Sequence, residues 1–331
     1  MWHGAMPERM TIEAQKDPAP DDLTATEYPV GRVEALTGIA SATLRVWERR
    51  YGRPVAHRRP SGHRRYDREQ VRWLRRVAEA LACGHRPGSV VRMSDAELDA
   101  LLRPQRGASD DPELAAWLGL VKTCRRDDLV RSLDEALATA ESTGTVCGWI
   151  DSRLAILLHR VGQEWAAGRL DIRHEHLATD AVDDVLRAAR PRIAERAATA
   201  ARSVTMLLAS LPGERHRLGL QMVALASASL GVTPVVLGDD SPLEEIVAAS
   251  RETGAAIVGL GTSLGPAGTR AARLVVDLRV ALPDDVALVV GGSGARLRRL
   301  PGVSTVSSLD EFRRWLESFT PRRSARDESA A

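Results

Sequence analysis

Five short apolar runs near the C-terminus, separated by segments of helix length, constrain the fold of this chain most strongly. The runs cover 203–211, 233–238, 255–261, 286–292 and 304–308. Helical patterns lie between or after them, at 216–230, 242–253, 266–282 and 309–318. Apolar and polar residues do not alternate within the runs, which is typical of strands buried on both faces. Strands and helices that alternate in this way predict an open, parallel, doubly wound α/β sheet over 201–319.

The segment before this sheet has apolar residues at helical spacing throughout. Four apolar stripes occur, within 114–121, 129–137, 150–165 and 177–186. Each stripe covers one face of an amphipathic helix, and the joins between the stripes are short. The pattern predicts an antiparallel four-helix bundle over 113–200.

A basic N-terminal region contrasts with the rest of the chain. Residues 30–92 contain 15 Arg and no Lys against 5 acidic residues, a local charge of +10. The whole chain carries only +2, so the remainder carries −8. An Arg-rich block on an otherwise acidic protein is typical of a nucleic-acid-binding face. The charge alone leaves a merely solvated surface as an equal alternative.

The region 28–103 begins with the pattern of two short helices joined by a tight turn. Apolar residues from Val30 to Leu36 predict the first helix, and Gly38 suits the turn that follows it. Ser41 is the predicted N-cap of a second helix, whose Trp47 faces inward. This is the spacing of a helix-turn-helix.

A predicted β-hairpin and a third helix complete this head. The turn at 60–62 separates two basic arms, as in the wing of a winged helix-turn-helix. Asp67, with Gln70 three residues later, predicts a capping box at the start of the third helix.

The remaining segments are interpreted as connections and ends. Residues 1–27 and 320–331 are polar and without periodicity, so we expect them to be disordered, and 104–112 is a predicted linker. No apolar stretch is long enough for a membrane span, and the N-terminus lacks a signal-peptide core, so we expect a cytoplasmic protein. The cysteines fit neither a disulfide framework nor a zinc site, and we expect buried or half-buried side chains for Cys83, Cys124 and Cys147.

The head resembles the DNA-binding domain of the MerR family. The resemblance lies in Thr37-Gly38-Ile39, Thr43-Leu44-Arg45-Val46-Trp47-Glu48 and Arg64-Arg65-Tyr66. It implies that the second helix enters the major groove of double-stranded promoter DNA and that the wing grips the flanking backbone. The residues carried over as DNA-binding are Thr43, Arg45, Arg49, Arg58, Arg59, His63, Arg64 and Tyr66. Surface solvation remains an equal alternative for any single Arg, and Tyr66 suits either a DNA contact or the core.

One departure from the MerR pattern bears on assembly. Many MerR proteins dimerise through a long helix after the head, whereas only residues 73–102 intervene here, with Pro87 and Gly88 inside them. We therefore expect a homo-oligomer, a dimer or a tetramer, that assembles through the C-terminal domains and reads an inverted repeat.

A short motif after the first strand of the α/β sheet resembles a cobalamin-binding motif. Glu214, His216 and Gly219 form Glu-x-His-x-x-Gly at the sheet edge where ligands bind. The resemblance is to the CarH family, a Rossmann-like cobalamin domain behind a MerR head. It implies that His216 is the axial nitrogen ligand of cobalt and that Glu214 holds the other ring nitrogen. The other residues expected at the cofactor are Gly219, Thr262, Leu264, Gly291 and Gly292. Taken alone, His216 would be an exposed loop histidine.

A second signature of the same family lies in the predicted bundle. Trp165, followed after nine residues by Glu175 and His176, resembles the motif that meets the upper, adenosyl face of the cofactor. Adenosylcobalamin is therefore the implied ligand. Some members place a histidine directly after this Trp, where this chain has Ala166. A histidine adduct after illumination is in doubt for that reason, with His174 and His176 as substitutes.

The resemblance implies a non-enzymatic DNA-binding regulator, a repressor in which light breaks the cobalt–carbon bond and changes oligomeric state and DNA affinity. Three alternatives remain open at this point. They are a regulator that senses cobalamin without light, a regulator whose sensor has lost cobalamin, and a corrinoid protein of the methyltransferase class.

Overall fold

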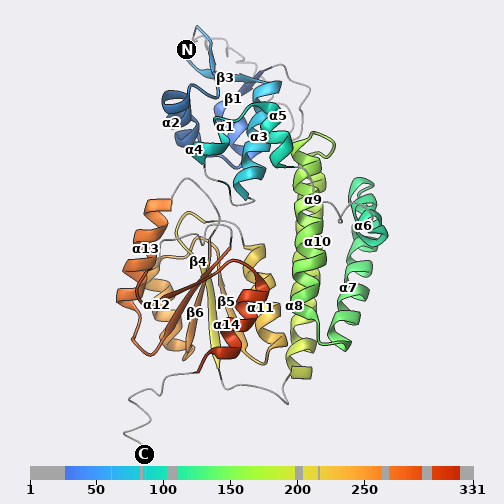
Figure 1. Cartoon of the computed structure of the whole chain (residues 1–331), viewed down its shortest axis with the longest axis vertical. Coiled ribbons are helices and arrows are strands. Elements are labelled where there is room, and N and C mark those ends of the chain that lie inside the picture. The colour runs from blue at the N-terminus through green and yellow to red at the C-terminus, as the bar shows by residue number, and fades with distance from the viewer. Residues whose placement is uncertain are drawn as a thin grey trace, which may run out of the picture.

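The computed structural model describes residues 27–60, 62–82, 85, 87–102, 111–197, 204–214, 217–262, 268–292 and 300–320. Figure 1 shows three bodies, with the head above and, below it, the long helices of the bundle beside the α/β body. No helix in these described ranges is both long and apolar enough to cross a membrane. The predicted disordered tails, apart from Glu27 and Thr320, and nearly all of the predicted linker lie outside the described residues. The expectation of disorder is wrong for Glu27, which belongs to a strand.

The head combines short helices with a small antiparallel sheet. Its helices are α1 (Val30–Thr37), α2 (Ser41–Tyr51), α3 (Arg68–Ala82), α4 (Pro87–Val90) and α5 (Asp95–Leu101). Its strands are β1 (Glu27–Pro29), β2 (His57–Arg58) and β3 (Arg64–Asp67), in the order β1-β3-β2. The predicted hairpin is confirmed, since β2 pairs antiparallel with β3. The strand β1, which has no pattern in the sequence, adds to the other edge of β3.

Two of the predicted helix caps differ from the structure. The helix α2 begins at Ser41 itself, and the Ser41 amide donates to the Glu34 carboxylate on α1, so Ser41 is not the N-cap. The Asp67 carboxylate does accept the Gln70 amide at 2.7 Å, as predicted. The Gln70 side chain, however, donates to the Val55 carbonyl, so the capping box is only half formed. In both places the hydrogen bond joins residues that are further apart in the sequence than the predicted cap. At Ser41 the acceptor is the Glu34 carboxylate, and at Gln70 it is the Val55 carbonyl.

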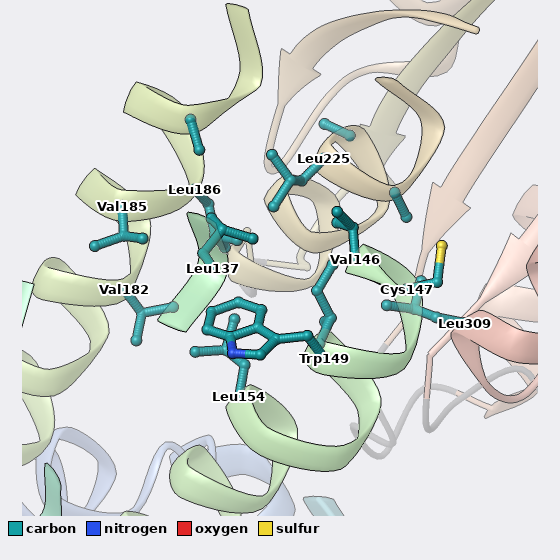
Figure 2. Packing of buried hydrophobic residues seen from close by; sticks show 14 of the residues in the cluster. Leu137, Val146, Cys147, Trp149, Leu154, Val182, Val185, Leu186, Leu225 and Leu309 are labelled. Carbon is teal, nitrogen blue, oxygen red and sulfur yellow. The ribbon is translucent and has the colours of Figure 1, made fainter. Parts of the chain in front are cut away.

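The bundle consists, within 111–197, of four helical rods. They are α6 (Pro112–Lys122), α7 (Arg126–Ser142), the continuous rod α8 (Val146–Trp149), η1 (Ile150–Leu154) and α9 (Ala155–Ala166), and α10 (Ile172–Ala197). The short stretch η1 is a π-helix. The predicted stripes supply the core, and Figure 2 shows Trp149 lying between Leu154 and Val182.

The third body is the predicted doubly wound sheet. Its strands are β4 (Thr205–Ser210), β5 (Thr233–Gly238), β6 (Ile257–Gly261), β7 (Ala287–Gly291) and β8 (Val303–Val306). Its helices are α11 (Leu218–Ser229), α12 (Leu243–Glu252), α13 (Gly268–Ala281) and α14 (Leu309–Ser318). The described strands pair in parallel in the order β5-β4-β6-β7-β8. The chain reverses direction across the sheet between β4 and β6, so the carboxyl ends of these strands form the switch point where ligands bind in such folds.

The bundle and the sheet share one hydrophobic core. The helix α10 packs on α11, and Val146 and Cys147 of α8 lie close to Leu225 of α11 and Leu309 of α14 (Figure 2). The expectation for the cysteines holds for Cys147, whose thiol pKa is raised by burial. It is wrong for Cys124, which is exposed at a left-handed turn with φ 54°, and Cys83 lies outside the described residues.

A carboxylate of the bundle caps a helix of the sheet. Asp151 of η1 accepts hydrogen bonds from the backbone N–H groups of Leu309 (3.4 Å) and Asp310 (3.1 Å) at the start of α14. These donors have no partner within their own helix, so the capping carboxylate stabilises α14 and fixes it against the bundle.

We predict that Asp151→Ala lowers the free energy of unfolding by about 1 kcal/mol, because the first-turn donors of α14 lose an anionic acceptor. Urea denaturation measures the change. The exposed Glu135 in the middle of α7 gives a control, and Glu135→Ala should change stability by less than about 0.5 kcal/mol. Equal stability of the Asp151→Ala and wild-type proteins would show that the Ser308 hydroxyl alone caps α14.

Candidate functional site

The loop after β4 is held in place by the loop after β5. The Gly213 amide donates to the Asp240 carboxylate at 2.7 Å, and the Asp240 amide donates to the Glu214 carbonyl at 3.0 Å. Glu214 is half-buried, and Arg215 and His216 lie outside the described residues. Description resumes at Arg217, one residue before α11 begins. The described residues that precede the expected axial ligand are thus anchored at the switch point.

Backbone atoms lie unusually close together at the carboxyl ends of β6 and β7. The Thr262 amide and hydroxyl both donate to the Gly291 carbonyl, at 2.9 and 3.1 Å. Gly292 has φ +100°, and a Cβ there would lie 2.4 Å from the Thr262 carbonyl oxygen. Only glycine fits such a position. Leu264, also expected here, lies outside the described residues.

Two observations at this edge fit a bulky ligand. A Cβ at Gly219, on the first turn of α11, would meet nothing within 4 Å, so the backbone there faces open space. The Ser210 hydroxyl at the end of β4 is buried and has no hydrogen-bond partner among the described residues. An unsatisfied buried hydroxyl is costly, and a ligand group that bonds to it would remove that cost.

A cavity of about 440 Å³ lies where the first turns of α10 face the start of α11. It is lined by His176, Leu177, Thr179, Asp180, Asp183, Arg217 and Leu218. The His176 side chain is 70% exposed, and its Nε2 lies 3.5 Å from the Glu175 carboxylate. Glu175 also accepts a hydrogen bond from the Thr179 hydroxyl at 2.9 Å. The structure therefore places His176 in the cavity and Glu175 in contact with its lining.

Trp165 has a different neighbour. The guanidinium of Arg75, on α3 of the head, lies over the Trp165 ring at 4.5 Å from its centroid. The indole N–H is buried and has no hydrogen-bond partner in the described part of the chain. Trp165 is thus separate from the residues that line the cavity, although the turn at Gly168, with φ 74°, joins its helix to that of His176.

The histidine candidates near the upper face differ in their surroundings. Ala166 is buried. His174 is buried too, and its Nδ1 accepts the Asp171 amide at 3.0 Å. His176 combines exposure with a place in the cavity, so its ring is the more accessible of the two.

Sequence reasoning missed Asp183 and Arg217. Asp183 is 6% exposed, and one of its carboxylate oxygens accepts from Arg187 at 2.9 Å and from Arg217 at 3.2 Å. The ion pair with Arg217 connects α10 to the residue that follows His216. The sequence does contain a signal for Asp183, which is a charged residue inside the apolar stripe of a predicted helix. That signal becomes informative only once α10 is known to pack on α11.

The predicted DNA-binding residues divide by exposure. Arg45, Arg49, Arg58, Arg59 and His63 are exposed, and Arg59 lies 3.5 Å from the carboxylate of Glu27 on β1. Arg64 is half-buried and bonds to the Glu48 carboxylate at 2.9 Å, which ties the wing to α2.

The other two predicted DNA contacts are buried. Thr43 lies on the inner face of α2, and Tyr66 is fully buried in the head core, where burial raises the pKa of its phenol. Burial favours a structural role for both over a DNA contact. The outer face of α2 includes the exposed Ala42, Val46 and Arg50, which helical spacing from Arg45 and Arg49 could have identified.

Comparison with known proteins relates the head and the bundle to described families. Residues 28–97 match the MerR HTH family of regulatory proteins, and residues 115–190 match the B12 binding domain. The chain is 29% identical to the HTH-type transcriptional repressor CarH of Myxococcus xanthus over 81% of this chain and 90% of that protein. It is 30% identical to the HTH-type transcriptional repressor CarA of the same organism over 80% of this chain and 86% of that protein.

Among solved structures, the monomethylamine corrinoid protein of Methanosarcina barkeri aligns with 59% of this chain and 94% of its own, at 16% identity and a TM-score of 0.45. Both repressors align with at least 80% of this chain. The chain therefore belongs to the family of cobalamin-binding, MerR-type transcriptional repressors that includes CarH and CarA.

Proposed function

We propose that this chain is a repressor that uses adenosylcobalamin to sense light, and that loss of the adenosyl group changes its oligomeric state and releases it from an inverted-repeat operator. The observation that carries the proposal is the cavity between His176 and Arg217. It opens between α10 of the bundle and the start of α11, where a flat ligand would touch the bundle on one face and the sheet domain on the other.

On the sheet side, His216 would supply the axial nitrogen to cobalt, with Glu214 holding the other ring nitrogen. The open backbone at Gly219 leaves room for a displaced nucleotide tail, and the close approach of Gly292 to the Thr262 backbone leaves no room for a side chain at that strand end. A neutral imidazole suits Co(III), which takes six ligands. These residue types fit a corrinoid bound with its lower base displaced.

On the bundle side, Trp165, Glu175 and His176 would surround the adenosyl group. The buried, unpartnered indole N–H of Trp165 supports this, because a nearby acceptor on a ligand would satisfy it. Bound adenosylcobalamin supplies a cobalt–carbon bond that light cleaves. With Ala166 buried directly after Trp165, the exposed ring of His176 is the proposed upper-face partner after illumination.

The replacement at Ala166 also supports a second candidate function. A chain without a histidine at this position can respond to the presence of adenosylcobalamin itself, with the cofactor as an effector in darkness. Comparing DNA affinity of the cofactor-free and cofactor-loaded proteins in darkness, and then after illumination, distinguishes this function from light sensing.

DNA binding would rest on the exposed cations of α2 and the wing. Arg49 on α2 and Arg58 on β2 are exposed, so they are free to approach phosphates. The Arg64–Glu48 ion pair would keep the wing in a fixed position relative to α2. The head would thereby present helix and wing to DNA as one rigid surface.

We predict that His216→Ala abolishes retention of cobalamin, because the corrinoid loses its protein-derived axial ligand. The ultraviolet–visible spectrum of protein mixed with adenosylcobalamin in darkness and then desalted measures the loss. His85→Ala, outside the sheet domain, is the matched control and should retain the full corrin absorption. Colour in the His216→Ala protein equal to that of the wild type would contradict the axial role.

We predict that the wild-type protein with adenosylcobalamin forms oligomers and shifts promoter DNA in darkness, and that green light reverses both. Gel filtration and electrophoretic mobility of the DNA measure the two effects. Cofactor-free protein under the same light is the control. An elution volume and a DNA shift that are unchanged by light would exclude the photoreceptor function.

We predict that Arg58→Ala weakens binding to all DNA sequences alike and reduces the slope of log affinity against log salt concentration by about 1, as expected for one lost phosphate contact. Tyr66→Phe serves as the control, since it removes a buried hydroxyl and should leave DNA affinity unchanged. Fluorescence anisotropy titrations at several salt concentrations measure both. Weaker DNA binding by Tyr66→Phe would show that the phenol reaches the DNA.

A further inference from the structure

The head docks on the bundle through the last half of α3 and α9. Figure 1 shows the lower end of α3 beside the top of α9. Arg75 of α3 is only 1% exposed, and its guanidinium lies over the Trp165 ring at 4.5 Å from the centroid. A cation held against an aromatic face is attracted by the ring's quadrupole, and the attraction is stronger where water is excluded.

Further contacts surround this pair. Glu79, one turn along α3, lies 3.2 Å from Nδ1 of His159 on α9. The side chain of Gln163 donates to the carbonyl of Leu102, at the end of the head, at 2.6 Å. A Cβ at Gly162 would lie 2.4 Å from the Glu79 carboxylate, so α9 is shaped to accept α3 closely. The head is therefore seated on α9 at a defined position.

In the proposed function, Trp165 would take part in two sites at once. One face of its ring carries the Arg75 guanidinium, and the residue is the proposed bundle-side contact of the adenosyl group. A change in the orientation of the indole would remove the ring from a buried cation. That change would cost the cation–π attraction between Arg75 and the ring, so the docked position of the head depends on how Trp165 is held.

We propose that Arg75 is a positioning residue that couples the cofactor site to the DNA-binding head through Trp165. The inference rests on the proposed function and adds the route by which the adenosyl group controls DNA affinity within one chain. With the adenosyl group bound, Trp165 is fixed and the head is seated. Without it, Trp165 is released and the head loses its fixed orientation. Coupling of this kind is reciprocal, so operator DNA must also tighten the binding of adenosylcobalamin.

Arg75→Met tests the coupling, because methionine keeps much of the apolar stem and removes the cation. The probe is an operator selected from random double-stranded DNA with the dark wild-type protein. Two ratios are measured for each protein. The first is the DNA affinity in darkness divided by the DNA affinity after green light. The second is the adenosylcobalamin affinity in darkness with operator present, divided by the same affinity without operator. We expect both ratios to fall about fivefold or more in Arg75→Met, while the corrin spectrum in darkness is unchanged.

Arg76→Ala is the matched control, since Arg76 directly follows Arg75 on α3 but pairs with Asp95 and Asp99 inside the head. It should keep both ratios at the wild-type values. Arg75→Lys keeps the charge without the planar fork and should give intermediate ratios, which provides a result even if Arg75→Met does not fold.

The outcomes separate the two proposals. Wild-type ratios near one would overturn the proposed function itself. A second result is that the wild-type ratios differ from one while Arg75→Met and Arg75→Lys keep the same ratios as the wild type. That result would overturn the coupling through Arg75. Equal losses in Arg75→Met and Arg76→Ala would show a general effect of charge on the head, and would also overturn it.

Discussion

The packing of α10 on α11 is the interaction on which the arrangement of this protein depends. It merges the bundle and the sheet into one hydrophobic core, which extends from Trp117 in α6 to Phe312 in α14. Apolar packing of this size fixes the distance between the two bodies. Polar contacts then fix their orientation, through Asp183 with Arg217 beside the cavity and through Asp151 at the start of α14.

Most of the fold could be predicted because each body has its own periodicity. Apolar runs without alternation identified all five described strands of the parallel sheet, and helical stripes identified the bundle. Features that depend on tertiary partners could not be predicted. The strand β1 has no pattern of its own and forms because β3 offers a free edge. The Gln70 side chain does not complete the predicted capping box, because it donates to the nearby Val55 carbonyl instead.

The candidate site shows the same division. Spacing placed Glu214 and Gly219 correctly in the loop after β4 and on the first turn of α11, since a motif tied to a strand end follows the strand. Exposure was harder to predict. Thr43 and Tyr66 match a DNA-binding pattern yet are buried, because a domain as small as the head must use side chains of α2 and of the wing to cover its own core. The neighbour of Trp165 was not predictable either, as Arg75 is 90 residues away in the sequence and is brought there by docking of the head.

The π-helical stretch Ile150–Leu154 determines in which direction the side chains of α9, which follows it on the same rod, face. A π-turn accommodates one residue more than a regular turn, and successive residues of an α-helix are rotated by about 100°. A relative with one residue fewer there would present a different side of α9 to the head, and the indole of Trp165 would face away from α3. The number of residues between this irregular turn and Trp165 therefore decides whether a relative can form the same contact between the head and the bundle.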